Sequence, residues 1–88
     1  MTDDMRRMIN ILVDWMLIQQ QAPDCLFERA VVMSILDEGG DHADRMQFAL
    51  SIVFGIDPDS LSSFLGSEKG YAGLQEILLR CSRVFLKS

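Results

Sequence analysis

The 88-residue sequence is poor in the side chains that carry most protein chemistry, with one histidine and two cysteines. Cys25 and Cys81 lie far apart, so they form neither a disulfide framework nor a metal-binding motif. Zinc requires several histidine or cysteine ligands, and nucleophilic catalysis requires a nucleophile, a base and an orienting group. His42 is linked to no nucleophile by any motif. We therefore expect no metal, no cofactor and no enzymatic activity.

Basic residues are also scarce, with 8 Lys and Arg against 13 Asp and Glu. Binding to nucleic acids or anionic membranes depends on clustered cations, so neither is an expected partner. The charge is uneven along the chain. Residues 1–44 hold nine acids and three bases, whereas the last positions are basic, with Arg80, Arg83 and Lys87.

Long apolar runs are absent as well. The most apolar stretch, from Met8 to Ile18, is interrupted by Asn10 and Asp14, and a membrane-spanning helix needs about 20 apolar residues in succession. A secretory signal would begin with cations, whereas acids precede this stretch. We expect a cytoplasmic protein. No window alternates apolar and polar residues for long enough to predict a strand.

Apolar residues instead recur with helical spacing between clear breakers. Helix ends are predicted at Pro23, Gly39-Gly40, Gly55 and Gly66. Asp24, Asp41, Asp57 and Ser67 are predicted N-caps, and Pro58 fits a first helical position. The predicted helices span residues 3–20, 25–38, 42–54, 58–65 and 68–86. We therefore predict one all-α domain over residues 1–88, a compact bundle of four longer helices and one short helix.

Two of these helices carry more apolar surface than one contact face needs. The first is apolar nearly all round, which predicts burial on several sides or an oligomer interface. The last has a heptad-like row, and Gly70 and Gly73 in its first turns permit close approach of another backbone. For the second helix, the predicted core face is Phe27, Ala30, Val31, Ser34 and Ile35. The candidate interface residues are Ile11, Trp15, Ile18, Tyr71, Leu74, Leu78 and Phe85.

The segment Asp37 to Asp44 gathers four carboxylates and the only histidine. A calcium loop that began at Asp37 would need a ligand at its third position and glycine at its sixth. Those positions hold Gly39 and His42 instead. We interpret the segment as two helix ends joined by a glycine turn.

The predicted second and third helices, joined at Gly39-Gly40, have the outline of a helix-turn-helix. The third helix would then read DNA, but Arg45 is its only cation and it stands beside Asp41 and Asp44. A DNA-binding regulator is thus the third hypothesis for function.

Asp59-Ser60-Leu61 resembles the Asp-Ser-Leu core of acyl carrier proteins, in which the serine carries phosphopantetheine. Size, acidity and helical class are similar to that family too. The glycine expected three residues before the serine is Asp57, and the long helix expected after it ends at Gly66. Phe54-Gly55-Ile56 is similar to the end of the long carrier helix, but that alignment places Gly40 at the serine position. The resemblance implies an acyl- or peptidyl-carrier domain, which is the second hypothesis.

The composition favours a different function. Hydrophobic residues make up 49% of the chain before its 6 glycines are counted, whereas typical domains reach about 45–50% with glycine included. Because a small domain has little interior, some of this surface should stay exposed, and exposed apolar patches usually bind a partner. We therefore predict a small acidic regulatory interaction module: an adaptor, inhibitor, antiactivator or chaperone-like protein that binds another protein. A homodimer is also expected.

Overall fold

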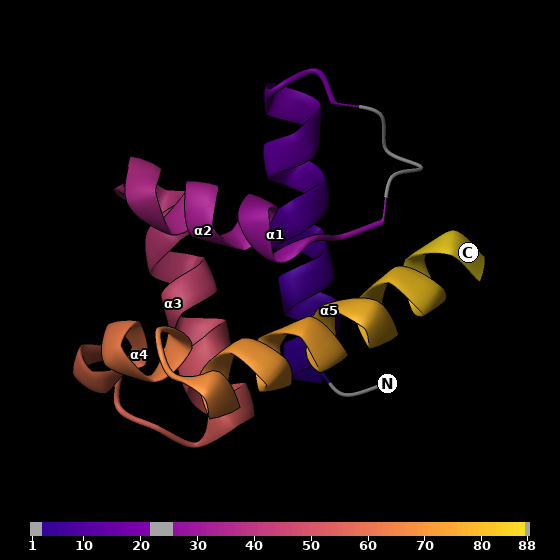
Figure 1. Ribbon diagram of the computed structural model, residues 1–88. Coiled ribbons are helices and arrows are strands. Elements are labelled where there is room, and N and C mark those ends of the chain that lie inside the picture. The colour runs from indigo at the N-terminus through magenta and orange to yellow at the C-terminus, as the bar shows by residue number, and fades with distance from the viewer. Residues whose placement is uncertain (1–2, 22–25, 88) are drawn as a thin grey trace.

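Five helices form the part of the chain that the computed structural model describes, residues 3–21 and 26–87, and these residues contain no strand (Figure 1). The helices are α1 (Asp3–Ile18), α2 (Arg29–Glu38), α3 (Gly40–Phe54), α4 (Pro58–Leu65) and α5 (Glu68–Lys87). The radius of gyration is 12.0 Å, and a compact chain of this length should have about 12 Å. The predicted all-α bundle is confirmed.

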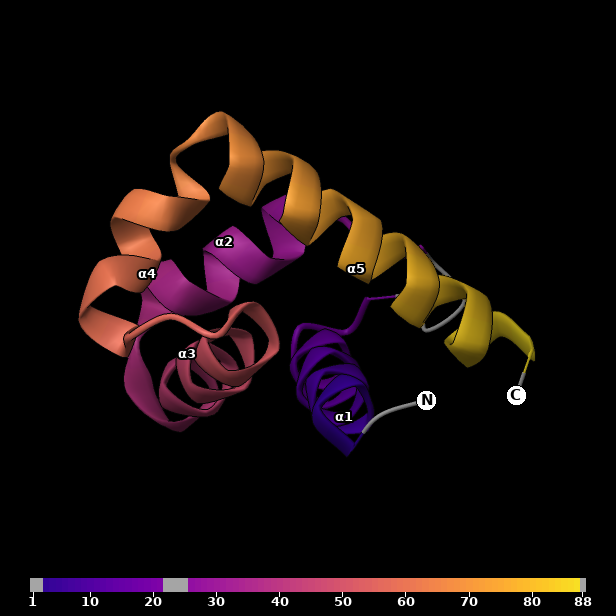
Figure 2. The same cartoon turned by 90° about the horizontal axis from the view of Figure 1, so that it is seen from below.

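The helices form two crossed layers (Figure 2). α1 and α3 pack side by side, and α2 and α5 cross the same face of this pair. α4 contacts both α3 and α5. α1 is therefore buried on several sides, as its apolar circumference predicted, since it contacts α2, α3 and α5.

The core draws side chains from all five helices. Its fully buried large side chains are Met8, Ile11, Leu12, Val32, Ile35, Met46, Leu50, Leu61, Leu74, Leu78 and Cys81. α1 alone buries six residues. At the edge of the core, the Trp15 indole N–H donates to Glu38 Oε2 at 2.9 Å and ties α1 to α2.

The predicted boundaries at Gly55, Pro58 and Ser67 are confirmed, and α2 and α4 end before Gly39 and Gly66 as predicted. Gly55 is left-handed, with φ +68°, and the Ile56 N–H donates to the Ser51 carbonyl at 3.1 Å, which closes a Schellman turn after α3. Pro58 begins α4. Ser67 caps α5, because its Oγ accepts a bond from the Gly70 N–H at 3.2 Å.

The turn between α2 and α3 is built differently from the prediction. Gly39 and Gly40 both have positive φ, at 73° and 82°, and α3 begins at Gly40. Asp41 is therefore inside the first turn of α3 and not its cap, although its charge still suits the positive end of the helix dipole. Asp57, another predicted cap, makes no side-chain capping bond.

α1 ends earlier than predicted, at Ile18. Gln20 adopts φ +58°, and the Gln21 N–H donates to the Met16 carbonyl at 2.8 Å. This is the same Schellman pattern as at Gly55, built on a residue that is not glycine. The predicted signals at Pro23 and Asp24 and the predicted helix start at Cys25 lie outside the described residues.

α2 begins at Arg29, so the prediction of helix over 26–28 was wrong. Leu26 to Glu28 have no helical structure, and Glu28 is extended, with φ −115° and ψ 155°. The predicted core face was partly wrong too. Ile35 and Val32 are fully buried, but Ala30 and Ser34 are exposed, because the helix starts later and its inward face is rotated.

The contact between α4 and α5 explains Gly70. A Cβ at this position would lie 1.8 Å from the Phe64 carbonyl oxygen and 2.9 Å from the Leu65 Cα. Only a residue without a side chain allows this approach. The close backbone approach that the sequence predicted is therefore used within the chain, where α5 crosses the end of α4.

Among the described residues, no single helix is long and apolar enough to cross a membrane. α3 and α4 reach the required length and apolar character only when taken together, and they are bent by 80°.

Candidate protein-interaction surface along α5

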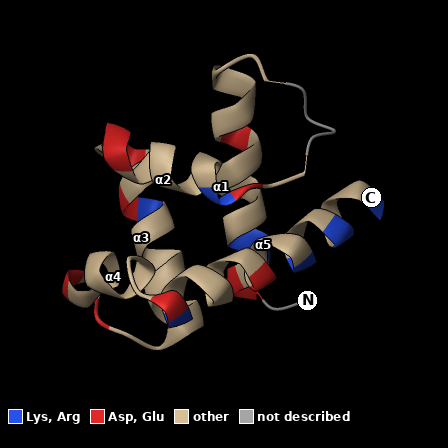
Figure 3. Ribbon diagram, viewed as in Figure 1, with Lys and Arg blue, Asp and Glu red and all other residues tan. Residues whose placement is uncertain are grey.

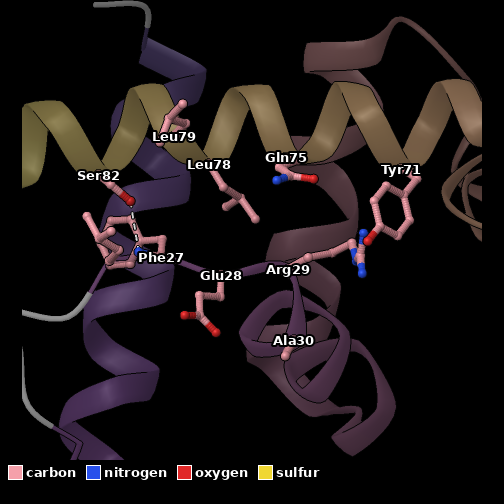
Figure 4. Close-up of a pocket in the computed structure, with 10 residues that line it drawn as sticks. Phe27, Glu28, Arg29, Ala30, Tyr71, Gln75, Leu78, Leu79 and Ser82 are labelled. Atoms are coloured by element: carbon pink, nitrogen blue, oxygen red, sulfur yellow. Dashed lines mark hydrogen bonds between the residues drawn. The ribbon is translucent and has the colours of Figure 1, made fainter.

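A groove lies between α5 and the segment that leads into α2 (Figure 4). Its volume is about 370 Å³. Its lining residues are Leu26, Phe27, Glu28, Arg29, Ala30, Tyr71, Gln75, Leu78, Leu79 and Ser82. We call this the α5 groove.

Local contacts fix the floor of the α5 groove. The Phe27 N–H donates to Ser82 Oγ at 2.8 Å, and both residues are buried. The Phe27 ring packs on Phe85, with ring centroids 5.0 Å apart. Because the Phe27 N–H is bonded to a side chain of α5, residues 26–28 stay extended against that helix.

The rim of the α5 groove is apolar and exposed. Leu26 is 54% exposed, Tyr71 48% and Leu79 47%. The Arg29 guanidinium stacks on the Tyr71 ring, 3.1 Å from its centroid (Figure 4). This cation–π contact joins the start of α2 to the start of α5 and holds one wall in place.

The exposed rim continues along α5 as one helical row. Tyr71, Gln75, Leu79 and Leu86 recur at intervals that keep them on the same face, and Leu86 is 49% exposed. We call these four residues the α5 row. It is an exposed apolar strip with one amide, interrupted between Leu79 and Leu86, where Ser82 is buried against Phe27.

Charges flank the α5 row unevenly (Figure 3). The first half of α5 carries Glu68, Lys69 and Glu76, and the second half carries only cations, Arg80, Arg83 and Lys87. Arg80 Nη2 lies 2.9 Å from Glu76 Oε1 within the helix. Within residues 3–21 and 26–87, neither Arg83 nor Lys87 forms an ion pair.

The predicted interface residues do not form one surface. Ile11, Leu74 and Leu78 are core residues that expose 1% or less of their area, and Trp15 is buried beside Glu38. The structure therefore places Ile11 and Leu74 in the core and Leu78 at the buried floor of the α5 groove. Ile18 is 63% exposed at the end of α1, Phe85 is half-buried, and Tyr71 lies on the α5 row.

Sequence reasoning missed Leu26, Leu79 and Leu86. Leu79 follows the core residue Leu78 directly, and the step of about 100° between neighbours places it outside the inward row of Leu74, Leu78 and Cys81. That adjacency, together with the eight-residue interval from Tyr71, is the signal that could have identified the exposed row.

A second exposed apolar pair lies on α3. Phe48 and Ile52 are 53% and 43% exposed, and the Arg7 guanidinium sits 5.6 Å from the Phe48 ring centroid. Neither Phe48 nor Ile52 lines the α5 groove. It therefore serves below as a matched control surface.

The acidic segment from Asp37 to Asp44 spans the end of α2 and the start of α3 (Figure 3). Across the described residues, no three His, Cys, Asp or Glu side chains come together so that they could hold a metal ion. His42 Nε2 is buried without a hydrogen-bond partner among those residues. Ser60, the serine of the carrier-like motif, is exposed in the first turn of α4, which has only 8 residues.

Cys81 lies on the inward face of α5 and is fully buried. Burial raises the pKa of its thiol from 9.0 to about 11, because an apolar environment disfavours the thiolate. It is therefore protonated near neutral pH and contributes to the core as a small apolar side chain.

Comparison of this chain with protein-family models, with curated proteins and with solved structures gives no match.

Proposed function

We propose that this protein is a small regulatory interaction module that acts by binding another protein, with the α5 groove and the α5 row as its binding surface. In this proposal it is a cytoplasmic adaptor, inhibitor, antiactivator or chaperone-like subunit and has no catalytic role. The observation that carries the proposal is the exposure of Leu26, Tyr71 and Leu79 around a groove with a buried apolar floor.

The physical reason is the cost of exposing this row to water. Burial of apolar surface contributes about 25 cal/mol per Å², so a partner that covers three large side chains gains affinity without further chemistry. The Arg29–Tyr71 stack and the Phe27–Ser82 bond hold the groove in shape before binding. Preformed sites lose less entropy on binding.

The shape and charge favour a helix as the bound element. α5 has 20 residues, which makes it about 30 Å long, and the α5 row from Tyr71 to Leu86 covers about 23 Å of that length. A helix from a partner could lay its apolar side on this row, and a carboxylate on its flank would meet Arg83. This is the helix-in-groove mode of recognition.

The test is affinity capture from the native host, followed by reconstitution with the purified partner. A true partner is retained by the wild type and by the control Ile52→Glu, and is lost with Leu79→Glu. Titration calorimetry should then show saturable binding with the same ranking of variants. A partner that binds all three proteins equally would place the interface elsewhere. If no host protein distinguishes Leu79→Glu from the other two, the proposal is overturned.

A further inference from the structure

We infer that the α5 groove binds a small alkyl carboxylate, with the carboxylate paired to the Arg29 guanidinium and the alkyl chain on the apolar floor beside Leu78. This site goes beyond the proposed function and does not depend on it, because a free ligand of this class needs no partner protein. The groove has a volume of about 370 Å³, which lies at the small end of the usual range for ligand sites, about 300–1,000 Å³.

Arg29 has binding capacity that the fold does not use. Its guanidinium carbon lies 3.1 Å from the Tyr71 ring centroid, and the side chain is half-buried. Within residues 3–21 and 26–87 it forms no ion pair and no hydrogen bond. Stacking covers one face of a guanidinium, whereas its five N–H donors lie in its plane and point outwards from its edges. The stack therefore fixes a planar donor group at the groove and leaves its edges open to an acceptor.

The polar groups around Arg29 select a monoanion. A guanidinium pairs with a carboxylate through two parallel hydrogen bonds, and one arginine balances one negative charge. Gln75 lies at the Arg29 end of the groove (Figure 4), where its amide adds a further donor. Glu28, the acidic lining residue, points away from α5 in the same view. Because no second cation lines the groove among the described residues, a dianion such as phosphate is less well matched than a carboxylate.

The rest of the groove suits an alkyl chain. Leu78 and Phe27 are buried beneath it, and Leu26 and Leu79 line its rim. Two polar groups of this floor, the Phe27 N–H and Ser82 Oγ, already bond to each other at 2.8 Å. A peptide placed here would leave its own amide groups against apolar side chains, which is costly. The floor therefore favours an alkyl chain over a peptide C-terminus.

The polar and apolar parts of the site lie at opposite ends of the groove (Figure 4). Arg29, Tyr71 and Gln75 gather at one end, and Phe27 and Ser82 lie at the other. The stretch of α5 from Tyr71 to Ser82 is about 16 Å long. An extended chain advances about 1.2 Å per bond, so decanoate spans about 11 Å. It can therefore reach from Arg29 across the apolar floor.

The first experiment titrates the full chain with decanoate and follows the amide chemical shifts by NMR. We expect saturable shifts, largest in residues 26–30 and 71–82. Decylamine, with the same chain and the opposite charge, should bind at least about tenfold more weakly. Each CH₂ removed from the acid should weaken binding by about fourfold, the value of a buried CH₂. Equal affinity for the amine, or no saturation by decanoate below its micelle concentration, would overturn the inference.

The second experiment assigns the carboxylate to Arg29. Arg29→Gln should weaken decanoate binding by about tenfold or more, since a charged hydrogen-bonded pair is lost. Gln75→Glu, at an exposed position, keeps the Arg29 stack and should weaken binding to a similar extent by repulsion. Arg7→Gln is the matched control, because Arg7 also sits over a ring, that of Phe48, but does not line the groove. It should bind decanoate as the wild type does. Unchanged affinity in either groove variant would overturn the pairing.

A third titration uses an acetylated leucine dipeptide, which carries the same carboxylate on a peptide backbone. It should bind about tenfold more weakly than decanoate, because its amide groups lose their water on the apolar floor. Tighter binding than decanoate would overturn the choice of an alkyl chain.

These titrations need no partner protein, so they separate the ligand site from the proposed function. If Leu79→Glu loses a host partner while decanoate does not bind the wild type, the ligand site is overturned and the interaction module stands. If decanoate binds as expected and no host partner is captured, the ligand site stands alone.

Discussion

The two halves of α5 are held in the fold by different means. At Gly70 the helix touches the backbone of α4, and no side chain fits between them. In the second half, contact is made by side chains, with Ser82 bonded to the Phe27 N–H and Phe85 packed on Phe27. The first half is therefore fixed by a close backbone contact in addition to the side chains of Tyr71 and Leu74. The second half has a polar anchor and an open outer face, so it can vary its surface without losing its position.

The largest expected effect is at the backbone contact. Gly70→Ala should destabilise the protein by about 3 kcal/mol or more, because the new Cβ overlaps a carbonyl that cannot rotate away. The gain of about 1 kcal/mol in helix propensity does not offset this. Urea unfolding followed by circular dichroism measures it.

Gly73→Ala is the matched control. Its Cβ would meet the edge of the Phe54 ring at 3.0 Å, and this neighbour is a side chain, which needs to shift by only a few tenths of an ångström. We expect its stability to stay within about 1 kcal/mol of the wild type, since helix propensity gains about that much. Equal losses at both glycines would mean that backbone contact is not what fixes this half.

The polar anchor of the second half should matter less. Ser82→Ala leaves the buried Phe27 N–H without its acceptor and should cost about 1–3 kcal/mol. Ser62→Ala, an exposed change on α4, should cost almost nothing. In hydrogen exchange, the Phe27 amide should lose protection in Ser82→Ala and keep it in Ser62→Ala. Unchanged protection in Ser82→Ala would show that the Ser82 hydroxyl does not anchor this amide.

Cys81 should make the second half sensitive to alkali. The folded thiol has a pKa of about 11, above its ordinary 9.0, so its contribution to stability is complete below pH 9 and declines as the pH rises towards and through 11. Thermal unfolding across this range should show a steeper loss in the wild type than in Cys81→Ala. If the two proteins lose stability equally as the pH rises, the Cys81 thiol is not the source of the alkali sensitivity.

The smallest effect belongs to the outer face. Leu79→Glu should change the free energy of unfolding of the monomer by no more than about 0.5 kcal/mol, the usual range for exposed sites. Urea unfolding of both proteins, followed by circular dichroism at the same concentration, measures the difference. A loss of several kcal/mol would mean that Leu79 belongs to the core.

Much of this fold could be predicted from local signals. Gly55, Pro58 and Ser67 act within a single turn, so their effects are readable from neighbouring residues. The burial of α1 on several sides followed from its apolar circumference. The all-α class needed only helical spacing and the absence of alternation.

Other features depend on contacts that local patterns do not encode. Residues 26–28 stay extended because of Ser82, more than fifty positions away. Gln20 adopts a left-handed conformation without the glycine that usually signals it. On α5, the inward row begins at Gly70 and not at Tyr71, because a glycine carries no apolar side chain that a pattern would count. Because of that one-residue difference Tyr71 faces outwards, and the exposed residues Leu79 and Leu86 on the same side of α5 were not recognised from the sequence.

The bond between Trp15 and Glu38 gives the protein a built-in optical reporter. Trp15 is the only tryptophan in the chain, so its emission comes from one place, the junction of α1 and α2. Its indole is 8% exposed and donates to Glu38 at 2.9 Å, and unfolding would transfer it to water. Because Trp15 does not line the α5 groove, its spectrum should follow the integrity of the bundle while the partner surface is altered. Loss of binding and loss of fold can thus be told apart in a single cuvette.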